Sequence, residues 1–135
     1  MYTILICDDD KDIRTALKIY LTGEGYRELE AENGRVSVTE HNEVHLVLMD
    51  IMMPQMDGVS ATAKLREEYN LPIILLTAKS EDNDKILGLT AGADDYITKP
   101  FNPLEVIARV KAQLRRYAYL GGMQCFQVSV SFFIL

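Results

Sequence analysis

The sequence predicts one α/β domain in which helices cover both faces of a parallel β-sheet. Short apolar runs recur with little polar alternation, as in Leu46–Met49, which is typical of strands buried on both faces. Helical patterns separate these runs, so right-handed crossovers and parallel pairing are expected. A chain of 135 residues with 48% apolar content can form one core but not a second domain of ordinary size.

Four of the five predicted strands bring a polar candidate site residue to their carboxyl ends, either as the last residue or directly after it. The strands are expected at residues 3–7, 26–31, 44–49, 72–77 and 93–98. The second of these alternates weakly, so it is expected at the edge of the sheet. Pro54 and Gly58 follow the central strand and cannot extend it, because proline lacks a ladder donor and glycine permits a tight turn.

Helices are predicted between and after the strands, at residues 10–23, 36–42, 59–69, 81–91 and 103–117. Asp10 or Asp12 can cap the first helix, and the pattern at 36–42 is the weakest of the five. The last helix has the clearest two-sided pattern. Its inward residues are expected to be Leu104, Ile107, Ala108 and Leu114, and its outward residues Glu105, Arg109, Arg115 and Arg116.

Charge and cysteine content exclude several classes of protein. The formal net charge of -6 is unfavourable for binding a polyanion directly, because nucleic-acid affinity depends on Lys and Arg. Cys7 and Cys125 lack metal-ligand spacing and are interpreted as reduced thiols. No apolar run approaches the ~20 residues of a membrane helix, and no signal peptide begins the chain. We therefore expect a soluble cytoplasmic protein without a membrane partner.

Parallel pairing brings the polar strand ends to one edge of the sheet, where ligands bind in folds of this class. Asp8 and Asp9 follow the first strand, Asp50 the third, Thr77 ends the fourth and Lys99 follows the fifth. Clustered carboxylates need a cation, and an oxygen-only set favours Mg²⁺. Thr77 and Lys99 supply the donors that a phosphoryl group needs. Asp50 is then the candidate nucleophile for forming an aspartyl phosphate.

Five motifs with this order and spacing resemble the CheY-like receiver domain of a two-component response regulator. They are Asp8-Asp9, Asp50 with the Met-Met-Pro that begins at Met52, Asp57-Gly58, Thr77-Ala78 and Lys99-Pro100-Phe101. The resemblance covers residues 1 to about 119. It implies a flavodoxin-like (βα)5 fold with strand order 2-1-3-4-5. It also implies phosphate transfer from a sensor histidine kinase to Asp50.

The same resemblance implies the roles of the individual site residues. Mg²⁺ would be bound by Asp9, Asp50 and the carbonyl of Met52, and by Asp8 through water. The phosphoryl group would contact Thr77, Ala78 and Lys99, and the Lys99–Pro100 bond would be cis. On phosphorylation the Thr77 hydroxyl would move to the phosphoryl group and Tyr96 would turn inward, which would repack the face formed by residues 81–91, 93–98 and 103–117.

Charges on that face resemble the dimer interface of the OmpR/PhoB-type winged-helix subfamily, which includes vancomycin-resistance-type regulators. The charged residues are Lys85, Asp94, Asp95, Glu105, Arg109 and Arg116. The resemblance implies a homodimer on phosphorylation, and DNA binding only through a C-terminal domain that is missing here. Instead, residues 120–135 form an atypical apolar tail whose last 13 residues are uncharged. We expect a truncated or altered reading frame or an added sequence, which if ordered packs on an apolar surface or pairs with another chain.

Three alternatives compete with the receiver hypothesis. A phosphatase of the haloacid-dehalogenase type needs a second aspartate two residues after the nucleophile. If Asp50 were the nucleophile, this position would be Met52. Asp8 and Asp10 have the required spacing, but the chain lacks the length for the cap domain of such a phosphatase. A flavodoxin-like electron carrier needs a hydroxyl- and glycine-rich loop after the first strand, and this chain has acids there. A single-domain receiver that acts on a protein target stays open.

Overall fold

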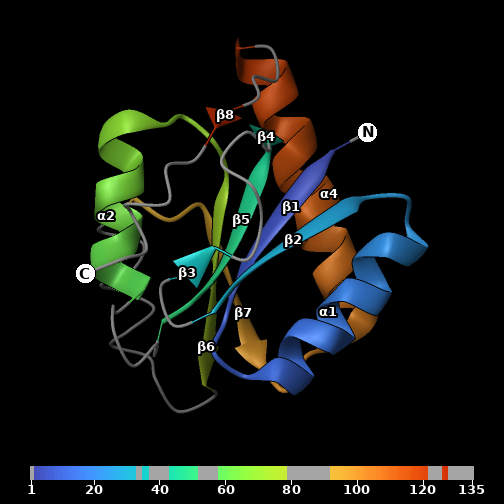
Figure 1. Cartoon of the computed structure of the whole chain (residues 1–135). Helices are drawn as coiled ribbons and strands as arrows, with labels where there is room; N and C mark the ends of the chain where they lie inside the picture. Colours follow the sequence, from blue (N-terminus) through green and yellow to red (C-terminus); the bar gives the residue numbers. More distant parts are fainter. Residues whose placement is uncertain are drawn as a thin grey trace.

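One β-sheet organises the part of the chain that the structure describes. The computed structural model describes residues 2–32, 35–36, 43–51, 58–78, 92–121 and 126–127. Within these ranges six strands form one sheet in the order β3-β2-β1-β5-β6-β7 (Figure 1). The strands are β1 Thr3–Cys7, β2 Arg27–Glu32, β3 Arg35–Val36, β5 Leu46–Asp50, β6 Ile73–Ala78 and β7 Asp95–Lys99.

Five of these strands run parallel and confirm the predicted flavodoxin-like order 2-1-3-4-5. In space they follow one another as β2, β1, β5, β6 and β7. β3 pairs antiparallel with β2, with Val36 opposite Ala31, so the prediction that a helix begins at residue 36 is wrong. β-branched residues such as valine favour strands over helices. Residues 37–42 lie outside the described part.

The described helices lie on both faces of the sheet. They are α1 Lys11–Gly23, α2 Gly58–Glu68 and α4 Pro103–Gly121. Figure 1 shows α1 and α4 on one face and α2 on the other. Asp10 caps α1 as predicted, since its side chain accepts the N–H groups of Asp12 and Ile13. The helix predicted at 81–91 lies outside the described residues, as do residues 52–57. None of the described helices has both the length and the apolar character of a membrane span.

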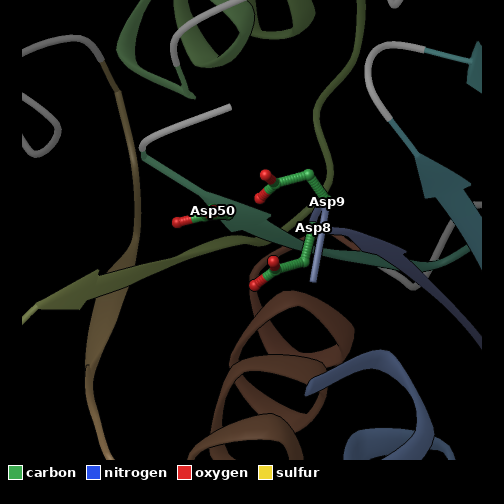
Figure 2. Close-up of side chains that lie close together, drawn as sticks. All are labelled: Asp8, Asp9 and Asp50. Carbon is green, nitrogen blue, oxygen red and sulfur yellow. The ribbon is translucent and has the colours of Figure 1, made fainter. Parts of the chain in front are cut away.

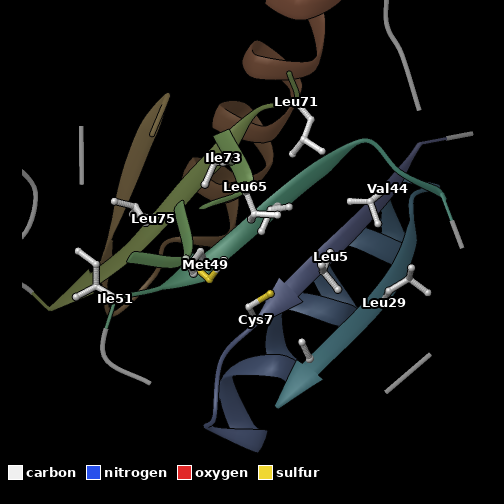
Figure 3. Packing of buried hydrophobic residues seen from close by; sticks show 13 residues of the cluster. Leu5, Cys7, Leu29, Val44, Met49, Ile51, Leu65, Leu71, Ile73 and Leu75 are labelled. Carbon is white, nitrogen blue, oxygen red and sulfur yellow. The ribbon is translucent and has the colours of Figure 1, made fainter. Parts of the chain in front are cut away.

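Side chains alternate between two buried layers, which explains why the strands are apolar without interruption. Residues such as Leu5, Met49 and Leu75 face α2, where Leu65 packs among them (Figure 3). Their neighbours in sequence, such as Leu48, face the opposite layer. That layer contains the buried residues Leu17 and Leu21 of α1 and Val106, Val110 and Leu114 of α4. The strands are therefore packed on both faces of the sheet, and this packing fixes the position of the residues at the carboxyl ends of the strands.

The inward face predicted for α4 is wrong at two of its four residues, and a third, Ile107, is only partly buried. Leu114 is buried as predicted, but Leu104 is 76% exposed and Ala108 is also exposed. The helix instead buries Val106, Val110 and Leu114, which are four residues apart and line one stripe. The β-branched valines therefore contact the sheet, and the stripe that begins with Leu104 faces away from it.

The expected third strand is divided at its start, and the tail contacts it. β4, Glu43–Val44, is separated from β5 by His45, whose buried ring accepts the backbone N–H of Thr3 at Nδ1 over 2.9 Å. A second short strand, β8 (Phe126–Gln127), pairs antiparallel with β4. The described part of the tail, Phe126–Gln127, thus pairs with a strand of its own chain.

Candidate functional site

Three carboxylates meet at the carboxyl edge of the sheet, as the strand pattern predicts. Asp8 and Asp9 follow β1, and Asp50 is the last residue of β5, the strand beside it. One carboxylate oxygen from each residue lies within 4.8 Å of the others. Figure 2 shows the three side chains gathered at the ends of these strands. Asp8 is fully buried and Asp50 is 5% exposed, so water screens the repulsion between their carboxylates only weakly.

Lys99 supplies the positive charge in this cluster. It ends β7, and its Nζ lies 3.1 Å from Asp8 Oδ2 and 3.2 Å from Asp50 Oδ1. The peptide bond between Lys99 and Pro100 is cis, as the family resemblance implies. One ammonium group cannot balance three carboxylates, so the described cluster retains a net negative charge.

The electrostatic environment shifts the pKa values of Asp8 and Lys99 in the same direction. Burial raises the pKa of Asp8, and the charge of Asp50 raises it further, against the lowering effects of the Asp10 N–H and Lys99. Burial lowers the pKa of Lys99, but the carboxylates of Asp50 and Asp8 outweigh it, so the pKa lies above its ordinary value. Lys99 therefore stays a cation at neutral pH, and Asp8 holds its negative charge at a cost.

Thr77 and Ala78 form the end of β6, between the strands that carry Asp50 and Lys99. The Thr77 side chain is buried, and within the described residues its Oγ1 has no hydrogen-bond partner. A buried hydroxyl without a partner is costly, which favours a ligand or a rearrangement that would use it. Tyr96 pairs in register with Leu75, so it points to the same face of the sheet as Thr77 and packs partly buried against the core.

Arg14 is part of this site and was not predicted from the sequence. It lies in α1 and is buried, and its Nη1 donates to the backbone carbonyl of Asp8 at 2.7 Å. Its Nε donates to Glu30 Oε1 on β2 at 3.0 Å. The N–H of Asp8 donates to the carbonyl of Ala31 at 3.3 Å. The backbone of Asp8 is thus held on both sides.

Gly58 was predicted only as a turn residue, but it also packs directly on the strand end that carries Asp50. A Cβ at this position would collide with the carbonyl oxygen of Asp50 and the Cα of Ile51. The Gly58 N–H donates to the Ile51 carbonyl at 2.9 Å. Glycine is therefore required here because α2 begins in contact with the backbone of β5.

The charges predicted for a dimer face form pairs within this chain. Arg109 donates to both carboxylate oxygens of Asp95, at 2.8 and 2.9 Å, and its Nε lies 3.8 Å from Glu105. Asp94 is partly buried and accepts hydrogen bonds from Arg66 at 2.7 Å and from the Ile73 N–H at 2.8 Å. Two further residues contact it from α4, namely Tyr117 at 2.8 Å and Arg116 at 3.5 Å. The predicted site residues Met52 and Lys85 lie outside the described part of the chain.

The donor set at the acid cluster fits a hard divalent cation such as Mg²⁺. Asp8, Asp9 and Asp50 offer only oxygen, and their separation leaves room for one ion between them. Nitrogen or thiolate ligands that would favour zinc are absent from this group of three. Such an ion would also neutralise the charge that Lys99 leaves uncompensated.

Comparisons with known proteins agree with this geometry. Residues 4–111 match the family model of the response regulator receiver domain. The response regulator GtcR of Aneurinibacillus migulanus is 52% identical over 117 residues, which cover 84% of this chain and 48% of that protein. The regulatory protein VanR of Enterococcus faecium is 46% identical over 123 residues, which cover 90% of this chain and 53% of that protein. The chain thus spans about half the length of these curated relatives.

Solved structures give the same result for the fold. The crystal structure of a CheY-like response regulator receiver domain protein from Methanospirillum hungatei JF-1 has a TM-score of 0.81 and 31% identity to this chain. The match covers 90% of this chain and 99% of that one. The predicted resemblance is thereby confirmed, including its similarity to a vancomycin-resistance-type regulator. The chain belongs to the response regulator receiver domains, which signal by phosphorylation.

Proposed function

We propose that Asp50 accepts a phosphoryl group from the phosphohistidine of a sensor histidine kinase. The observation that carries this proposal is the cluster of Asp8, Asp9, Asp50 and Lys99 at one edge of the sheet. Of the three carboxylates, only Asp50 lies within a strand, β5, which is paired on both sides, whereas Asp8 and Asp9 follow the end of β1. It is therefore held in the most rigid position and is suited to in-line attack on phosphorus.

Transfer exchanges one bond to phosphorus for another. A carboxylate oxygen of Asp50 forms the new P–O bond, the P–N bond of the donor breaks, and its electron pair returns to the imidazole nitrogen. Lys99 is already 3.2 Å from Asp50 and would stabilise negative charge on the phosphoryl oxygens. The Thr77 hydroxyl, which ends the adjacent strand, would donate to another of these oxygens.

We also propose that this chemistry uses Mg²⁺, held by Asp9 and Asp50 directly, by Asp8 through water and by the carbonyl of Met52. A bound Mg²⁺ supplies positive charge that stabilises the phosphoryl oxygens. The negative charge of the described cluster supports this proposal, because one lysine does not balance three carboxylates. The chain's own part is to hold these oxygens in place before the phosphodonor arrives.

The proposed output is a change on the face that carries β7 and α4. Thr77 would move toward the phosphoryl group, and Tyr96 would turn inward behind it. The charge pairs of Asp95, Arg109 and Glu105 lie on this face and would be exchanged for pairs with a second copy. These pairs are partly open to solvent, where ion pairs contribute little stability, so such an exchange is energetically accessible.

For the whole protein we propose transcriptional control through a DNA-binding domain outside residues 1–119. Two observations support it: this chain has a net charge of -6, and the curated relatives are response regulators or regulatory proteins about twice as long. An output through a protein target instead remains the alternative, and it would share the same phosphorylation site.

The test of the phosphorylation site is a labelling experiment with a small acyl phosphate and Mg²⁺. Intact-mass spectrometry should show one added phosphoryl group on the wild type and none on Asp50→Asn. Asp12→Asn, an exposed acid on α1, is the matched control and should be labelled like the wild type. A label on Asp50→Asn equal to that of the wild type would refute the assignment.

The test of dimerisation measures mass by light scattering before and after complete phosphorylation. The wild type should double its mass, and Arg109→Glu should not, because this change repels both Asp95 and Glu105. Arg115→Glu changes an exposed residue of the same helix and should still dimerise. An unchanged mass of the fully phosphorylated wild type would exclude the proposed dimer.

A further inference from the structure

Arg14 is a buried cation that the proposed phosphoryl transfer does not use directly. Its side chain is only 8% exposed, and it lies between α1, β2 and the end of β1. A guanidinium stays charged at any pH at which a protein is folded. Removing it from water is costly unless ion pairs and hydrogen bonds compensate. The Glu30 carboxylate and the Asp8 carbonyl supply two such partners.

The carbonyl that Arg14 holds belongs to the peptide unit that joins Asp8 to Asp9. This unit is planar, so fixing its orientation fixes the relative positions of the Cα atoms from which the two neighbouring side chains extend. The Asp8 carboxylate is held further by the N–H of Asp10, which donates to Oδ1 at 2.9 Å. Asp9 is partly exposed, and its position depends more on the backbone that precedes it.

We propose that Arg14 is a positioning residue that orients the Asp8–Asp9 peptide so that both carboxylates meet Asp50 around one divalent cation. Glu30 has a supporting role, because it fixes the Nε side of the guanidinium while Nη1 reaches the Asp8 carbonyl. The inference rests on the proposed function, since it assigns Arg14 to the proposed cation site. Residues that orient metal ligands typically change metal affinity by about 10- to 100-fold when replaced.

Orientation and simple electrostatics predict opposite effects of removing Arg14. A positive charge near the carboxylates repels Mg²⁺, so Arg14→Gln would strengthen Mg²⁺ binding if charge alone mattered. If Arg14 orients the peptide, the same variant binds Mg²⁺ more weakly. Arg14→Lys separates the two effects, because it keeps the charge but replaces the planar fork by a single ammonium that cannot span both partners.

The experiment measures Mg²⁺ affinity of the unphosphorylated protein by isothermal titration calorimetry. Arg14→Gln and Arg14→Lys should both raise the Kd for Mg²⁺ about 10-fold. Lys18→Gln removes an exposed cation one turn further along α1 and should leave the Kd within about twofold of the wild type. Glu30→Gln keeps an acceptor for Nε. It should raise the Kd for Mg²⁺ by more than Lys18→Gln does and by less than the two Arg14 variants do. Unfolding curves in urea confirm that each variant is folded at the titration temperature.

Labelling kinetics give a second readout that loss of stability would not imitate. With the acyl phosphate, Arg14→Lys should need about 10-fold more Mg²⁺ for half-maximal rate, with the maximal rate at saturating Mg²⁺ close to that of the wild type. An Arg14→Lys Kd equal to that of the wild type would overturn the inference and leave the proposed function intact. A wild type that binds no Mg²⁺ would instead overturn the proposed function, and the inference with it.

Discussion

Replacing Asp8 by asparagine should make the metal-free protein more stable, although it removes a residue of the proposed site. Asparagine has the same shape, and its Oδ1 can still accept the N–H of Asp10. The backbone contacts of Asp8 with Arg14 and Ala31 also remain. The change therefore removes one buried negative charge, and with it both the repulsion from the neighbouring carboxylates and the ion pair with Lys99.

The size of the effect follows from the distances in the cluster. The carboxylate oxygens of Asp8, Asp9 and Asp50 lie within 4.8 Å of one another, and two unit charges at this upper limit repel by about 3.5 kcal/mol at an effective dielectric constant near 20. Asp8 has two such neighbours. Its ion pair with Lys99 at 3.1 Å contributes about 5.4 kcal/mol of attraction on the same scale. Repulsion exceeds attraction by about 1.5 kcal/mol, so Asp8→Asn should gain about 1 to 2 kcal/mol. The raised pKa of Asp8, caused mainly by burial, has the same sign.

Urea unfolding with a chelator, and again with Mg²⁺, tests this expectation. Without Mg²⁺ the variant should have the larger free energy of unfolding. With Mg²⁺ the wild type should gain stability in proportion to the logarithm of the ion concentration, and Asp8→Asn should gain much less. Glu67→Gln removes one charge from an exposed position of α2 and controls for net charge. If Asp8→Asn is no more stable than the wild type in chelator, the electrostatic account of the cluster is wrong.

Three further expectations concern other parts of the fold. Burial, and to a smaller extent the charge of Glu30 on the same strand, raises the pKa of Glu28 from 4.5 to about 7. The protonated form therefore stabilises the fold below pH 4.5, and this stabilisation is lost as the pH rises through 7. Allowing for its partial exposure, Glu28→Gln should gain on the order of 1 kcal/mol over the wild type in urea unfolding at pH 8 and little at pH 4.5, whereas an equal gain at both pH values would contradict this. Burial raises the pKa of the Cys7 thiol, so peptide mapping after alkylation should find Cys7 modified only once the protein is unfolded; rapid modification of the native protein would contradict this. Gly58→Ala should destabilise the protein by about 1 to 3 kcal/mol because its Cβ meets the backbone of Asp50, whereas Gly23→Ala, where nothing lies within 4 Å, should not; equal effects would exclude the steric explanation.

The sequence was sufficient to predict the sheet and the acid cluster because both depend on short-range patterns. An apolar run that ends in a polar residue marks a strand and its carboxyl end together, as at Asp50 and Thr77. Parallel topology then brings such ends to one edge, whatever the exact packing of the helices. The separation of the carboxylates and their contacts with Lys99 required the structure, since pattern alone specifies an edge and not a distance.

The direction in which a helix faces is harder to predict, and α4 shows why. Leu104, Ile107 and Ala108 have helical spacing, and so do Val106, Val110 and Leu114. Both sets satisfy a 3.6-residue period, and they point in different directions around the same helix. The set that contacts the sheet is decided by the direction in which the chain enters the helix after β7. No local sequence pattern predicts this direction. The outcome leaves Leu104 exposed on the side of the helix that is not covered by the sheet.

The burial of Arg14, by contrast, can be predicted from the helical spacing of the residues of α1. Arg14, Leu17 and Leu21 are three and then four residues apart, so they lie on one stripe, and all three are buried. A cation on the inward stripe of a helix must meet an acceptor there, because an unpaired buried charge would destabilise the fold. Since α1 begins immediately after the acids that follow β1, the nearest backbone to its first turns is that of Asp8. The capping of α1, the burial of Arg14 and the orientation of the acid pair are therefore consequences of one short connection between β1 and α1.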